Sequence, residues 1–230
     1  MNAAQLTGLL TQAKGRAERN LWFGALLARE AETVIVIVGG SAIEVYTSGR
    51  YVSSDLDLVG ARDSIIPTLE VWGFQREGRL WYRRDLELWI DPVGRTYTGD
   101  ERRLRRVSTP YGPVFLASVE DLIAKRLIEI KVWPRGSTSL FEQAIALASE
   151  YSDAIDWEYV RSVARRDGAE DLVPELRRRI LPPTDRQAGP AHPPRPGSDR
   201  APRRKPQPRR KATGPEGTRP SSFSSGTRSR

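Results

Sequence analysis

The feature that most constrains the fold is an apolar run that ends in two glycines and a serine. Residues 34–38 read Val-Ile-Val-Ile-Val, and Gly39, Gly40 and Ser41 follow them. A continuous β-branched run is typical of a strand buried on both faces, here expected over 33–38. The segment 41–48 has the length of a helix. Its N-terminus therefore predicts an opening where free backbone N–H groups bind phosphate oxygens.

Two aspartates alternate with apolar residues directly after that helix. The sequence Asp55-Leu56-Asp57-Leu58-Val59 predicts a second strand. Carboxylates two positions apart on a strand point to the same side, while Leu56 and Leu58 point into the core. Asp55 and Asp57 can therefore share metal ions.

A two-metal site also needs a third carboxylate from a neighbouring strand. Residues 86–91 alternate strongly and predict a strand whose acidic face carries Glu87 and Asp91. Both residues qualify as the third ligand. We favour Asp91, with Glu87 as the alternative.

The composition removes most other catalytic chemistries. The chain has no cysteine, and its single histidine, His192, lies near the C-terminus. Disulfides, thiol chemistry and zinc sites built on thiolates are thereby excluded. Carboxylates, Lys, Arg, Tyr and hydroxyl groups remain, and hard cations such as Mg²⁺ are their natural cofactors.

The periodicity along the chain predicts a mixed α/β (α+β) fold. A mixed β-sheet flanked by helices is followed by a small C-terminal helical bundle. Further helices are expected over 3–30, 64–72, 140–149, 157–166 and 170–180 and after an N-cap at Ser118, and hairpins over 74–82 and 104–117. The predicted organisation is a domain at 1–117, a helical region at 118–180 and a tail at 181–230.

The tail differs sharply from the rest in charge and composition. It holds 12 of the 37 Lys and Arg residues, 3 of the 29 Asp and Glu residues and 11 of the 17 prolines. Such a composition predicts disorder. Residues 1–180 hold 25 basic and 26 acidic residues, so whole-chain basicity is poor evidence that the folded part binds nucleic acid. The tail is expected to be an electrostatic arm for RNA, DNA or another polyanion, or else an extension without function.

No apolar run approaches the ~20 residues of a membrane span, and we expect a cytoplasmic protein without a signal peptide.

Together, the glycines and aspartates carry a recognisable resemblance. Gly39-Gly40-Ser41, a spacer with Gly49-Arg50, and Asp55-Leu56-Asp57 resemble the G-G-[ST]…D-x-D signature of the nucleotidyltransferase (polymerase β-like) superfamily. More narrowly, the chain is similar over roughly residues 25–180 to small bacterial nucleotidyltransferase-like proteins related to the AbiEii toxins. Segments that fit this group include Gly73-Phe74, Ile90-Asp91-Pro92, Gly99-Asp100-Glu101, Val119-Glu120-Asp121-Leu122-Ile123 and Glu142-Gln143-Ala144. Where relatives carry a His-Trp-x-Asp motif, this chain keeps only Trp133.

The resemblance implies transfer of a nucleoside monophosphate from an NTP to an acceptor, with pyrophosphate leaving. It implies a site of two Mg²⁺ ions, with Mn²⁺ as a substitute, in which Asp55 and Asp57 bind both ions. Asp91 would complete the ion that activates the acceptor hydroxyl. The implied nucleotide-binding residues are Gly39, Gly40, Ser41, Arg50, Lys125 and Arg126. Arg50 could instead form a surface ion pair, and Lys125 and Arg126 could be the solvated face of a helix.

The implied acceptor is RNA, with tRNA as the analogy, or a protein hydroxyl. A role in toxin–antitoxin or phage-defence systems, with a cognate antitoxin as partner, follows from the same resemblance. The alternative is a catalytically inactive nucleotidyltransferase-fold module that binds nucleic acid or a partner protein.

Overall fold

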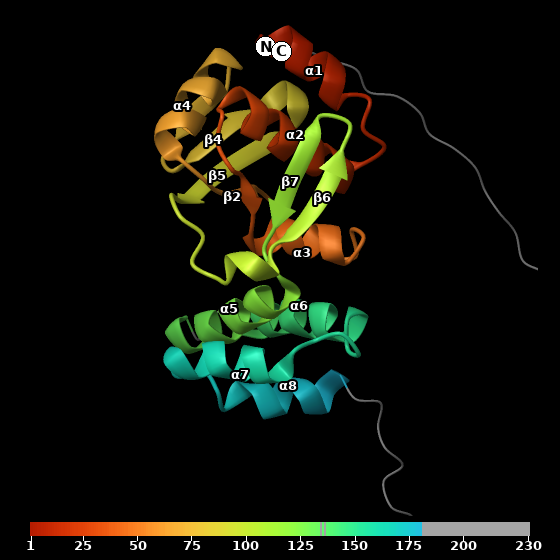
Figure 1. Cartoon of the computed structure of the whole chain (residues 1–230), viewed down its shortest axis with the longest axis vertical. Helices are drawn as coiled ribbons and strands as arrows, with labels where there is room; N and C mark the ends of the chain where they lie inside the picture. The colour runs from red at the N-terminus through yellow and green to blue at the C-terminus, as the bar shows by residue number, and fades with distance from the viewer. Residues whose placement is uncertain (134, 136, 181–230) are drawn as a thin grey trace, which may run out of the picture. The chain divides into compact units, whose positions relative to one another are not determined.

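The computed structural model describes residues 1–133, 135 and 137–180. A seven-stranded mixed sheet with helices packed on it is followed by four helices (Figure 1). The α/β architecture predicted from the periodicity is confirmed. The tail predicted at 181–230 lies outside the described residues.

The sheet places the predicted acidic strands side by side. Its strands are β1 (Val36–Ile37), β2 (Leu56–Val59), β3 (Gln75–Glu77), β4 (Leu80–Arg83), β5 (Leu88–Gly94), β6 (Arg105–Thr109) and β7 (Gly112–Leu116), in the order β3-β4-β5-β2-β1-β7-β6. β2 and β5 run parallel, and their register sets Asp57 directly beside Asp91. β1 lies between β2, to which it is antiparallel, and β7, to which it is parallel. This central position explains its apolar sequence.

The first predicted helix, over 3–30, is in fact two helices. The helices are α1 (Ala3–Leu10), α2 (Arg16–Glu30), α3 (Gly39–Tyr46), α4 (Arg62–Val71), α5 (Val119–Val132), α6 (Ser137–Glu150), α7 (Trp157–Arg166) and α8 (Leu172–Ile180). The helix is interrupted between Thr11 and Gly15, and Gly15 has an extended backbone. α2 then packs tightly on the sheet, because a Cβ at Gly24 would lie 2.9 Å from a methyl carbon of Val114.

Two predicted strands are shorter in the structure. The strand expected over 33–38 is reduced to β1, and the side chain of Val34 is 61% exposed. Residues Arg84–Leu86 form a 3₁₀ turn, and Glu87 follows with φ +48°. A left-handed residue interrupts the strand alternation, so β5 begins only at Leu88.

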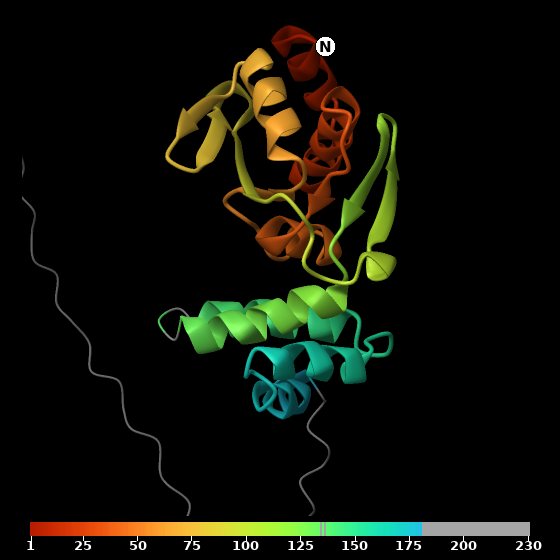
Figure 2. The ribbon, with the colours of Figure 1, turned by 60° about the vertical axis from the view of Figure 1, so that its left-hand side comes forward.

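The four C-terminal helices pack together, and α5 and α6 also contact α3 (Figure 2). The Tyr46 hydroxyl of α3 donates to the carbonyl of Ala117 at 2.8 Å, and the Tyr151 hydroxyl donates to the carbonyl of Tyr46 at 3.3 Å. One hydrophobic core therefore runs through the sheet region and the helices. Among the described residues, no helix combines the length and apolarity needed to cross a membrane.

Candidate metal centre and adjoining cavity

Three carboxylates converge at one edge of the β2–β5 pair. Asp55, Asp57 and Asp91 each offer an oxygen atom, and these atoms all lie within 4.8 Å of one another. Asp57 on β2 is set beside Asp91 by the parallel register of β2 with β5, and Asp55 lies in the bend directly before β2, which begins one residue later than predicted. Asp91 is the most enclosed of the three, with 3% of its surface exposed.

The glycines at the start of α3 let the backbone approach this acidic group. The Gly40 N–H donates to Oδ2 of Asp57 at 3.1 Å. Gly39 has φ +56°, and a Cβ there would lie 2.0 Å from the same Oδ2 atom. A Cβ at Gly40 would lie 2.6 Å from Oγ of Ser53. Any larger residue at either position would therefore displace Asp57 or the loop that precedes Asp55.

Ser41, expected to hold a triphosphate, is placed differently. Its side chain is fully buried, and its hydroxyl accepts from the Asp57 N–H at 2.9 Å and lies 3.4 Å from the Val38 carbonyl. The hydroxyl thus ties α3 to β2. In this structure the Ser41 hydroxyl supports the position of Asp57, and its contact with a triphosphate stays a prediction.

The electrostatics of the group call for a cation. Burial, then the neighbouring charges of Asp55 and Asp91, raise the pKa of Asp57 to about 6, although the Gly40 N–H opposes the shift. Burial also raises the pKa of Asp91, with Arg79 opposing. No described residue donates a hydrogen bond to Oδ2 of Asp91, a buried atom. An all-oxygen donor set with repelling charges and an unsatisfied oxygen fits a hard divalent cation.

Glu87 and Arg50 lie elsewhere. Glu87, the alternative third ligand, lines a separate cavity with Arg16, Arg19 and Trp89 because its left-handed backbone takes it off the β5 face. Arg50 forms an ion pair with Glu150 of α6, which is the surface pair weighed as the alternative to a phosphate contact.

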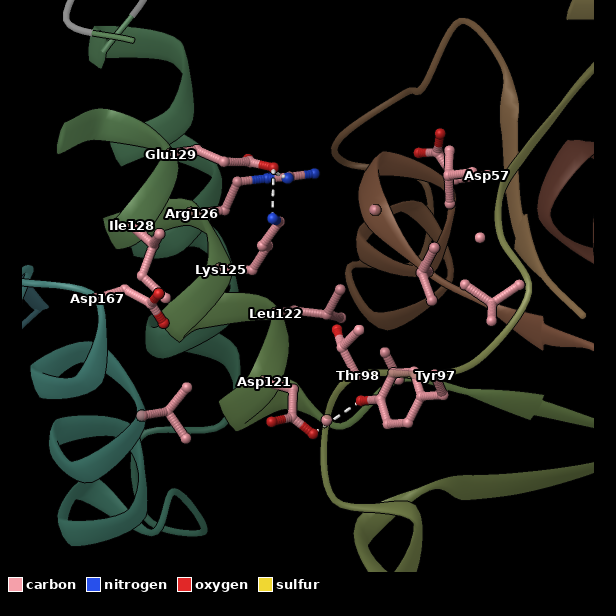
Figure 3. Close-up of a pocket in the computed structure, with 18 of the residues that line it drawn as sticks. Asp57, Tyr97, Thr98, Asp121, Leu122, Lys125, Arg126, Ile128, Glu129 and Asp167 are labelled. Atoms are coloured by element: carbon pink, nitrogen blue, oxygen red, sulfur yellow. Dashed lines mark hydrogen bonds and ion pairs between the residues drawn. The ribbon is translucent and has the colours of Figure 1, made fainter. Parts of the chain in front are cut away.

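A cavity of about 850 Å³ extends from Asp57 and Gly39 to α5 and α7. Figure 3 shows Asp57 on one side and Lys125, Arg126 and Glu129 of α5 on the other. Arg126 is 8% exposed, and its guanidinium is bonded to Gln143 and Glu129, both at 2.6 Å. The Lys125 side chain is 64% exposed, and its Nζ atom lies 3.9 Å from Oε1 of Glu129. Lys125 and Arg126 thus both line the cavity. The positive charge of Arg126 is close enough to Asp57 to oppose the rise in the pKa of Asp57.

Comparison with known proteins gives one structural likeness. No family model and no curated protein matches this chain. A solution structure of the antibiotic-resistance factor ANT(2'')-Ia matches with 17% sequence identity and a TM-score of 0.47. The match covers 79% of this chain and 100% of that chain.

The structure adds cavity residues that the motifs did not reveal. Asp121 accepts from the hydroxyls of Tyr97 at 2.7 Å and Tyr159 at 2.8 Å, and so joins the loop after β5 to α5 and α7. Burial and Asp121 raise the pKa of Tyr97 far above its usual range and that of Tyr159 to about 12, so both hydroxyls stay protonated donors. The capping pattern at Ser118 marked Asp121 as a helix-start residue. Its tyrosine partners come from distant segments and leave no local signal.

Arg79, in the turn between β3 and β4, is a further residue that the structure brings to the acidic group. Its Nε atom lies 2.9 Å from Oδ2 of Asp91. Arg79 lies at the tip of the hairpin predicted over 74–82, since Glu77 pairs with Leu80. Because β4 pairs with β5, that tip lies next to the strand that carries Asp91.

Proposed function

We propose that this protein is a metal-dependent nucleotidyltransferase that moves a nucleoside monophosphate from an NTP to an acceptor hydroxyl. The observation that carries the proposal is the convergence of Asp55, Asp57 and Asp91 beside the two glycines that begin α3. This geometry agrees with the roles that the resemblance to the nucleotidyltransferase superfamily implies.

Each residue of the acidic group has a definable task. Asp55 and Asp57 would hold two Mg²⁺ ions, or Mn²⁺, and Asp91 would complete the coordination of one of them. Bound ions of this kind neutralise phosphate charge and make the acceptor hydroxyl a better nucleophile. The Gly40 N–H holds Asp57 in place, while Ser41 fixes the backbone of Asp57.

The cavity has the size and chemistry for the nucleotide. Its volume of about 850 Å³ lies in the range of about 300–1,000 Å³ usual for small-molecule sites. Lys125 and Arg126 supply positive charge on the wall opposite Asp57, where phosphate oxygens would be attracted. Val59, Val93 and Leu122 supply apolar lining for a base or ribose.

Transfer of label from an α-labelled NTP tests the proposal. We expect Mg²⁺-dependent labelling of an acceptor by the wild-type protein, and background labelling by Asp57→Asn, which keeps the shape but removes a charge. Asp63→Asn, which alters an exposed carboxylate paired with Arg95, is the matched control and should label normally. Calorimetry that detects neither NTP nor Mg²⁺ binding at millimolar ligand would contradict the proposal.

The acceptor we propose is RNA, with tRNA as the first to test, or a protein hydroxyl. A toxin-like role with a cognate antitoxin, as the AbiEii-like resemblance implies, belongs to the same proposal. Digestion of the labelled product with ribonuclease or protease distinguishes the two acceptors. Label that resists both enzymes would contradict this choice of acceptor.

A further inference from the structure

Arg79 makes an ion pair of unusual asymmetry. Its side chain is 78% exposed, whereas that of Asp91 is 4% exposed. The Nε atom of Arg79 lies 2.9 Å from Oδ2 of Asp91, yet Oδ2 receives no hydrogen bond from any described residue. A guanidinium that lies near a carboxylate without an aligned hydrogen bond binds it more weakly than one that donates such a bond.

The hairpin that carries Arg79 brings it to the metal centre. Glu77 pairs with Leu80, so Gly78 and Arg79 form a two-residue loop, and Gly78 takes the positive φ of +59° at its first position. β4 continues antiparallel to β5, with Trp81 beside Ile90. The loop therefore ends beside Asp91, at the outer side of the acidic group.

A divalent cation would compete with Arg79 for the same oxygen. A hard dication gains from all three carboxylates at once, whereas the guanidinium contacts Asp91 alone. Arg79 can leave without a packing cost, because most of its side chain is already in solvent. Once displaced, its guanidinium remains next to the centre, and a planar guanidinium binds phosphate oxygens through paired donors.

We propose that Arg79 is a phosphate-binding residue of the site, held on Asp91 until a divalent cation takes its place. The phosphate part of this inference rests on the proposed function. Arg79 then has two opposite effects. It weakens metal binding in the absence of nucleotide, and it strengthens binding of the nucleotide triphosphate once metal is present.

Arg79→Gln separates these effects. Free Mn²⁺ can be counted by its paramagnetic resonance signal during titration of the protein without nucleotide. We expect the variant to bind Mn²⁺ about two- to fivefold more tightly than the wild type. Calorimetry at saturating Mn²⁺, with a non-hydrolysable nucleoside triphosphate, should show binding about tenfold weaker than in the wild type.

The control is Arg179→Gln, on α8. The side chain of Arg179 is 55% exposed and pairs with Glu175 at 2.6 Å, so this variant also removes an exposed arginine from an ion pair. This variant should leave both affinities unchanged. Equal Mn²⁺ affinity, or equal nucleotide affinity, in wild type and Arg79→Gln would overturn the inference.

The outcome for Arg79 is distinguishable from that for the proposed function. If the wild type binds Mn²⁺ and nucleotide but transfers no label, the proposed function fails while the two affinity shifts still support Arg79. If label transfer occurs and the affinities do not shift, only the inference about Arg79 fails. If neither protein binds Mn²⁺, both are overturned.

Discussion

At the scale of single residues, the site depends on a close approach that only glycine permits. Gly39 combines a left-handed backbone with a contact to Asp57 that leaves no room for a Cβ atom. The N–H of the next residue, Gly40, donates a hydrogen bond to Asp57. The backbone of α3 and the carboxylate of β2 are therefore fitted to each other, and a substitution at Gly39 alters both stability and the metal centre.

Gly39→Ala should lower the free energy of unfolding by about 2–4 kcal/mol, from left-handed strain plus displacement of Asp57. The matched control is Gly49→Ala, at φ +79°, where an added Cβ meets no described atom within 4 Å. It should cost only the strain, about 1–2 kcal/mol. Urea unfolding measures both values, and Mn²⁺ titration should show weakened binding for Gly39→Ala alone. Equal losses of stability in the two variants would mean that the contact with Asp57 is unimportant.

The raised pKa of Asp57 predicts the pH dependence of stability. Because the folded-state pKa of about 6 exceeds the unfolded value of about 3.9, the folded state binds the proton more tightly. The associated stability is fully present below the unfolded pKa and is lost as pH rises through about 6. Asn mimics the protonated form. At pH 8 without metal, Asp57→Asn should therefore be more stable than the wild type, on the order of 1–3 kcal/mol.

Denaturant melts at pH 4 and pH 8 check this prediction. The advantage of Asp57→Asn should shrink at pH 4, where the wild-type carboxyl is largely protonated. Asp63→Asn is again the control, because Arg95 holds the pKa of Asp63 below its usual range. Its effect should have the opposite sign, since that carboxylate loses its partner as pH falls. An advantage for Asp57→Asn that is independent of pH would contradict the assigned pKa.

At the scale of helices and strands, predictions from local pattern succeeded where the cause is local. α7 has the predicted bounds, and Asp156 caps it through the Tyr159 N–H. The convergence of Asp55, Asp57 and Asp91 was also predicted, but it depends in addition on the parallel pairing of β2 with β5, which is not local. The prediction that Glu87 lies on the acidic face of β5 was wrong. Glu87 has a left-handed backbone and precedes the first residue of β5, and the strand alternation does not reveal this turn. The positions of Ser41, Arg50 and Arg79 depend on tertiary partners, which a pattern of spacing does not contain.

The start of α5 is a second element on which the cavity depends. Oγ of Ser118 accepts from the Asp121 N–H at 3.0 Å and donates to Oδ2 of Asp121 at 2.8 Å. Ser118→Ala should lower stability by about 1–2 kcal/mol, through loss of the cap in a buried setting. Ser162→Ala, which removes an exposed hydroxyl bonded to the Tyr159 carbonyl of α7, should change stability by less than about 0.5 kcal/mol. Thermal or urea melts that rank the two variants in reverse would contradict this account of the α5 start.

At the scale of the whole molecule, charge is distributed unevenly along the chain. Residues 1–180 are close to neutral, and residues 181–230 carry a large excess of arginine and lysine. The catalytic chemistry we propose needs only the first part. Affinity for polyanions is a property that we assign to the second part.

Removal of residues 181–230 should therefore separate the two properties. We expect the truncated chain to lose most of its affinity for single-stranded RNA at low salt, together with the salt dependence of that binding. Metal and nucleotide binding should be retained. Fluorescence anisotropy with a labelled oligonucleotide at several salt concentrations measures the first effect. RNA affinity that survives truncation would place the binding surface within residues 1–180.

The central position of β1 has a consequence for how the chain is made. β1 pairs with β2 across a short separation, Val36 with Val59, but with β7 across a long one, Val36 with Phe115. During synthesis, the strands that carry the acidic group emerge before β7. Until β7 arrives, one edge of an apolar strand has no partner, and such an edge is prone to pair with other chains. The nascent chain therefore exposes this unpaired edge, which is only two residues long, at a stage when the strands of the carboxylate cluster have already been made.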